Sequence, residues 1–187
     1  MNLQPNIKAL EDAIANGMLI SGAWSNGSEA ACMMGHLVSG AHSVEDCVTD
    51  GWPEWLVNLN ISLFDDCPKD EQASFALAVA KACDGKDIPE SVAQKHAARC
   101  LTRCLGYIGE GGEPWRVQCK QVVASTIEIL NKGRWLNAID AARAADAARA
   151  AGAAWAAGAA RAAGAAGAAE RTHQRADLIE LLSEVKA

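Results

Sequence analysis

A run of alanines between residues 140 and 170 constrains the fold of this 187-residue chain more than any other feature of its sequence. Within the run, pairs of Ala alternate with single residues that are charged, Gly or Trp. These single residues are Asp140, Arg143, Asp146, Arg149, Gly152, Trp155, Gly158, Arg161, Gly164, Gly167 and Glu170. Because Ala has the highest helix propensity of the amino acids, we expect the segment to be α-helical.

Helical geometry divides this segment into two faces. At about 100° per residue, the three Arg residues and Asp146 fall on one third of the circumference. The opposite face carries Ala, Gly152 and Trp155 at alternating intervals of four and three, which is the spacing of a helix that packs lengthwise on another. The segment is therefore predicted to pack closely along its length, against its own chain or against a partner, and whether it breaks near residues 164–167 stays open. The predicted partner-binding residues are Arg143, Arg149, Gly152, Trp155 and Arg161.

The rest of the chain is predicted to form shorter helices separated by Gly and Pro. Helices are expected over residues 5–16, 28–38, 89–107, 114–131 and 172–186, with others beginning near Ser43, Pro53 and Pro68. Because no segment alternates steadily between apolar and polar residues, strands are not expected, apart from a short extended piece at residues 18–21. The predicted fold class is all-α, a multi-helix bundle with a long Ala-rich C-terminal helix. A change of composition divides the chain into a helical globular domain, residues 1–134, and the Ala-rich helix with the C-terminal helix, residues 135–187, expected to pack on the same domain.

Charge and composition narrow the class of function. The net charge of −6 gives no support for binding nucleic acid directly through a basic face. The apolar stretch of residues 150–169 contains Arg161, so we expect no membrane span. The N-terminus has no signal-peptide pattern. Seven Cys without a pairing pattern indicate reduced, mostly buried thiols in a cytoplasmic protein, and the six Trp are expected to occupy packing positions.

Few motifs in the sequence are typical of metal binding or catalysis. Cys32 with His36, and His96 with Cys100, have the i,i+4 spacing that allows two neighbouring helices to bind Zn²⁺. The alternative is that these are ordinary buried residues, and no closely paired Cys loop supports a zinc site. No Gly-x-Ser-x-Gly motif or phosphate-binding loop is present. We therefore predict no catalytic residue, no metal, no cofactor and no enzymatic activity, although a small zinc-dependent enzyme is kept as an alternative.

Several short segments resemble a set of uncharacterised bacteriophage and prophage proteins. The segments are Ala-Leu-Glu-Asp-Ala-Ile at 9–14, Leu-Ile-Ser-Gly-Ala-Trp at 19–24 and Glu-Ala-Ala-Cys at 29–32, followed by Cys47, Pro-Glu-Trp-Leu at 53–56 and Ala-Ala-Trp-Ala-Ala at 153–157. The resemblance covers the first sixty residues and the tail, and His36 departs from the pattern. It implies a phage or mobile-element origin, without an activity or functional residues.

Together these observations favour a phage-encoded, non-enzymatic binding protein of the host bacterial cytoplasm. Its expected role is a counter-defence inhibitor, similar to an anti-CRISPR protein, or a protein that sequesters a defence signal. The alternative from another class is a structural protein that self-associates through the Ala/Gly/Trp face. The sequence leaves open the identity of the partner, the oligomeric state, and whether Cys32, His36, His96 and Cys100 approach one another.

Overall fold

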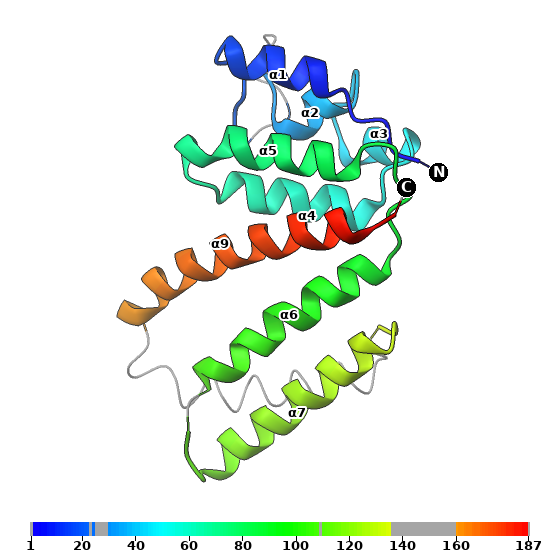
Figure 1. Cartoon of the computed structure of the whole chain (residues 1–187). Coiled ribbons are helices and arrows are strands. Elements are labelled where there is room, and N and C mark those ends of the chain that lie inside the picture. The colour runs from blue at the N-terminus through cyan, green and yellow to red at the C-terminus, as the bar shows by residue number, and fades with distance from the viewer. Residues whose placement is uncertain (1, 23, 25–29, 109, 136–159, 187) are drawn as a thin grey trace. The chain divides into compact units, whose positions relative to one another are not determined.

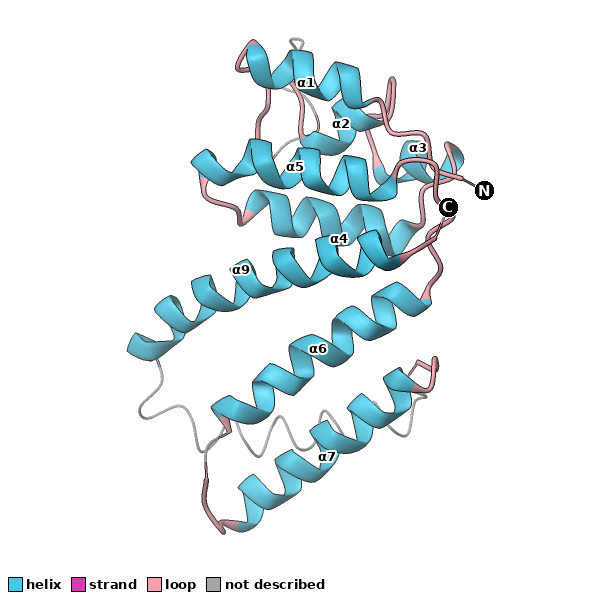
Figure 2. Ribbon diagram, viewed as in Figure 1, coloured by secondary structure: helices cyan, strands magenta, loops and turns pink. Residues whose placement is uncertain are grey.

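The computed structural model describes residues 2–22, 24, 30–108, 110–135 and 160–186. Eight α-helices form within these residues, and pairing between extended segments is limited to one isolated parallel bridge between Leu19 and Ala31. The predicted all-α class is confirmed (Figure 2). The helices are α1 (Ile7–Ala15), α2 (Met33–Leu37), α3 (Val44–Thr49), α4 (Glu54–Asp65), α5 (Lys69–Cys83), α6 (Ser91–Tyr107), α7 (Pro114–Asn131) and α9 (Ala160–Glu184).

Most helix ends follow from local chemistry. Ser43 accepts a hydrogen bond from the backbone N–H of Asp46 at 3.2 Å and so caps the start of α3. Gly85 follows α5 with a φ of +70°, a backbone conformation that residues other than Gly rarely adopt. The expected helix of residues 114–131 is α7 itself, with Pro114 in its first turn.

Helix α2 is shorter than expected because its N-terminal flank is extended. Ala31 donates its backbone N–H to Met18 O at 3.1 Å and accepts the N–H of Ile20 at 3.0 Å. These bonds use the backbone groups that a longer helix would need, so α2 begins at Met33. The short extended piece expected at residues 18–21 takes part in this pairing.

The chain forms two compact units, Met1–Pro89 with Arg171–Ala187, and Glu90–Glu170. In the first unit, α4 packs against α2, α3 and α5, and α1 packs against α2 and α5 (Figure 1). The largest fully buried side chains of this core include Trp52, Phe64, Leu10, Met33 and Leu63. The predicted packing role of Trp is thus confirmed for Trp52. The domain division expected at residue 134 stays a prediction.

The C-terminal half of α9 belongs to the first unit. Leu178, Leu181 and Leu182 are buried there, and the ammonium group of Lys86 donates to Leu182 O at 3.0 Å and Ser183 O at 3.3 Å. These carbonyls belong to the last turn of the helix, where a cation is favourable. Helix α9 continues unbroken through residues 164–167, which answers the question of a break there.

The second unit contains the antiparallel pair α6 and α7, which pack along their length (Figure 1). Trp135, after α7, is 47% exposed, and its indole N–H donates to Glu90 Oε1 at 2.6 Å. The prediction that Trp135 occupies a packing position is therefore wrong, because its polar atom pairs with a carboxylate at the surface. No helix among the described residues is long and apolar enough to cross a membrane.

Candidate functional site

The partner-binding residues predicted from the sequence lie largely outside the described part of the chain. Arg143, Arg149, Gly152 and Trp155 lie outside the described residues, and Arg161 falls within α9 with its side chain outside them. The binding face of the Ala-rich segment therefore stays a prediction.

The two Cys/His pairs fall in different units. Cys32 directly precedes α2 in the first unit, and His36 Nε2 lies 3.3 Å from the carbonyl oxygen of Met18. His96 and Cys100 lie on α6 in the second unit, with His96 Nδ1 3.9 Å from Cys100 Sγ. Within the part of the chain that the structure describes, no group of three or more His, Cys, Asp or Glu is arranged to hold a metal ion.

Charge is distributed unevenly along the sequence. Residues 1–89 contain thirteen Asp and Glu against four Lys and Arg, a net charge of −9. Residues 171–187 contain three of each sign, so the first unit keeps a net charge of −9. Residues 90–170 contain seven acidic and ten basic residues, a net charge of +3. The overall charge of −6 therefore conceals an acidic first unit and a basic second unit.

The described acidic side chains of residues 1–89 face solvent. Twelve of the thirteen carboxylate residues between 1 and 89 are described, and all twelve are exposed. They are Glu11, Asp12, Glu45, Asp46, Asp50, Glu54, Asp65, Asp66, Asp70, Glu71, Asp84 and Asp87. An exposed excess of one sign raises the local potential and attracts partners of the opposite sign.

Some of these carboxylates already have partners within the first unit. At the turn between α4 and α5, Asp66 pairs with Arg171 at 3.0 Å and Glu71 with the buried Arg175 at 2.7 Å. Asp46 accepts the backbone N–H of His42 at 2.8 Å. That bond, together with the Ser43 hydroxyl group, holds the pKa of the Asp46 carboxyl below its ordinary value. These groups contribute to the fold rather than to binding.

A second group of carboxylates has no basic partner among the described residues. Glu45 lies on the solvent face of α3, Asp50 follows that helix, and Glu54 is the first residue of α4. Val48, one helical turn beyond Glu45, is 42% exposed, whereas Cys47 on the opposite side of α3 is fully buried. We call Glu45, Val48, Asp50 and Glu54 the α3–α4 acidic surface. It combines unpaired negative charge with an apolar contact residue.

The total net charge of the chain does not reveal this surface. The signal was available in the sequence, as the sign of the charge counted separately over residues 1–89 and 90–170. No protein-family model, curated protein or solved structure matches the chain.

Proposed function

We propose that this chain is a phage-encoded, non-enzymatic binding protein of the host bacterial cytoplasm that inhibits a defence protein by covering a basic, nucleic-acid-binding surface. The observation that carries the proposal is the net charge of −9 on the first unit, with every described carboxylate of residues 1–89 exposed. The α3–α4 acidic surface is the proposed contact region. The phage origin rests on the sequence resemblance.

The charge pattern supports a basic protein partner in particular. Proteins that bind nucleic acid place Lys and Arg where they neutralise closely spaced phosphates. Exposed carboxylates on a folded helical surface offer such a partner negative charge in place of the phosphates. Complementary charge also accelerates association and disfavours wrong partners.

The same pattern argues against sequestration of a nucleotide signal by the first unit. Nucleotide signals carry phosphates, so an acidic surface repels them. The exposed Val48 instead provides the apolar contact that protein interfaces combine with a charged rim. An inhibitor of a protein is therefore favoured over a signal-sequestering protein.

The test is capture of host proteins from bacterial lysate on the tagged full chain. We expect a host protein with a basic surface to be retained at about 0.1 M salt and released at about 0.5 M salt, because screening weakens exposed charge pairs. The substitutions Glu45→Gln, Asp50→Asn and Glu54→Gln together are expected to weaken binding about tenfold. This corresponds to about 0.5 kcal/mol for each exposed charge pair.

A matched control places the same change of charge in the second unit. Glu110→Gln, Glu113→Gln and Glu128→Gln together also remove three negative charges, from residues that are exposed in the structure. This control is expected to bind as the wild type does. Recovery of no host protein above background, or equal weakening in both variants, would contradict the proposal.

A further inference from the structure

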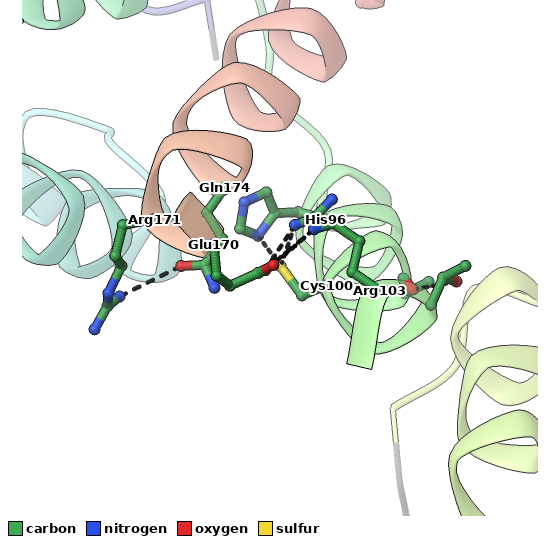
Figure 3. A network of polar contacts seen from close by, with 8 residues as sticks. His96, Cys100, Arg103, Glu170, Arg171 and Gln174 are labelled. Carbon is green, nitrogen blue, oxygen red and sulfur yellow. Dashed lines mark hydrogen bonds and ion pairs between the residues drawn. The ribbon is translucent and has the colours of Figure 1, made fainter. Parts of the chain in front are cut away.

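Cys100 lies in a polar cluster of α6 that the proposed binding function does not use. Cys100 is half-buried, and its sulfur has nitrogen groups on two sides, one helical turn before it and one after it (Figure 3). His96 Nδ1 lies 3.9 Å from Cys100 Sγ, and Arg103 Nη2 donates to the same sulfur at 3.5 Å. The spacing of four and three residues places all three side chains on one face of the helix.

Arg103 is held in this position by a carboxylate of the same unit. Its Nε lies 2.9 Å from Glu170 Oε2, and its Nη2 lies 2.9 Å from Glu170 Oε1 (Figure 3). Such two-point pairing fixes the plane of the guanidinium group. The pair is only partly exposed, so the group that faces the Cys100 sulfur is a positioned cation rather than a mobile surface side chain.

Four buried cysteines have thiols that are poorly disposed to react. Burial raises the pKa of Cys47 and of Cys83 to about 12, and it also raises the pKa of Cys32 and Cys67. A thiol must lose its proton to act as a nucleophile, and a raised pKa keeps the proton in place. Cys119 is 95% buried, since its exposed fraction is 5%.

Cys104 provides an internal comparison for Cys100, because it lies one turn further along α6 and is exposed. Despite this exposure, partial burial of its thiol and the nearby Glu170 carboxylate raise its pKa, and Arg103 offsets only part of the effect. Cys104 is thus more accessible to solvent, whereas the sulfur of Cys100 has a histidine nitrogen and a guanidinium group beside it.

We propose that Cys100 is a modification site, a nucleophilic thiol that forms a mixed disulfide with low-molecular-weight disulfides. His96 Nδ1 accepts the proton of the Cys100 thiol, and the thiolate is stabilised by the imidazolium that results and by the Arg103 guanidinium. The thiolate attacks one sulfur of the disulfide R–S–S–R. A new S–S bond forms at Cys100 while the old one breaks, and the leaving thiolate RS⁻ takes a proton from solvent. No external oxidant is needed, because the disulfide itself is reduced.

The first test uses the reduced, full-length wild-type chain. It is treated with oxidised glutathione, and the modified cysteine is identified by peptide mass spectrometry at early times. We expect glutathionylation of Cys100 to be at least ten times faster than glutathionylation of Cys104. Equal rates at the two sites, or faster reaction at Cys104, would overturn the proposal.

Variants then distinguish the role of the Cys100 sulfur from the roles of His96 and Arg103. Cys100→Ser is expected to abolish the fast reaction, whereas Cys104→Ser leaves it unchanged. Arg103→Gln and His96→Asn are each expected to slow it at least fivefold, and Arg103→Lys, which keeps the positive charge, restores part of the rate. If Cys100 reacts as fast in Arg103→Gln and in His96→Asn as it does in the wild type, the proposal is wrong. Where circular dichroism shows that a variant is unfolded, the ratio of the two sites in the wild type decides alone.

Discussion

Removal of one buried leucine from the end of α9 tests how the C-terminal residues stabilise the first unit. Leu182 has no exposed surface. Leu182→Ala removes apolar groups worth about 2.4 kcal/mol by transfer and leaves a cavity, so the expected loss in the free energy of unfolding is about 3 kcal/mol. For a domain of about 100 residues, this lowers the melting temperature by about 12 °C.

The assay is thermal unfolding of the full chain, followed by circular dichroism. The control is His173→Ala, an exposed position on the same helix and in the same unit, for which the expected change is within about 0.5 kcal/mol. If Leu182→Ala melts within 1 °C of His173→Ala, the end of α9 does not belong to the core of the first unit.

Three further predictions concern individual side chains. Lys86→Met is expected to lower the free energy of unfolding by about 1 kcal/mol relative to Lys95→Met, an exposed control inside α6, because it removes the cation at the last carbonyls of α9. Urea unfolding measures this difference. Because the pKa of Asp46 is lowered in the folded state, its stabilisation is complete above the ordinary value of 3.8 and is lost as the pH falls through the folded pKa. The urea midpoints of wild type and Asp46→Asn are therefore expected to differ at pH 6 and to converge below pH 3.8, and a constant difference would contradict this. Cys47 and Cys83, with pKa values of about 12, are expected to resist a maleimide at pH 8 in the folded protein and to react after unfolding in urea, as mass spectrometry can show.

The all-α class and most helix limits were predictable from the sequence because they depend on neighbouring residues. Pro114 and the Gly residues after α5 and α7 mark helix ends without reference to the rest of the fold. The expected helix of residues 28–38 was too long, because backbone pairing of Ala31 with residues on the other side of a connection competes with it. Such pairing is not visible in local propensity.

The candidate sites show the same distinction. The acidity of residues 1–89 can be counted in the sequence. The exposure of its described carboxylates, and the pairing of Asp66 and Glu71 with distant Arg residues, depend on the fold. The i,i+4 spacing of His96 and Cys100 is visible in the sequence, where it is typical of one half of a zinc site. The group that changes its interpretation is Arg103, which is oriented by Glu170, sixty-seven residues further along the chain. One sequence carries no sign of that contact.

Competition with nucleic acid tests the proposed function most directly. The host protein captured on the chain is mixed with a duplex oligonucleotide at constant ionic strength, and its release is measured. Because the chain is proposed to cover the basic surface that binds nucleic acid, the oligonucleotide is expected to displace the captured protein, and to do so at lower concentration when Glu45, Asp50 and Glu54 are replaced by their amides. A stable complex of all three components, or release that does not depend on these substitutions, would contradict the account.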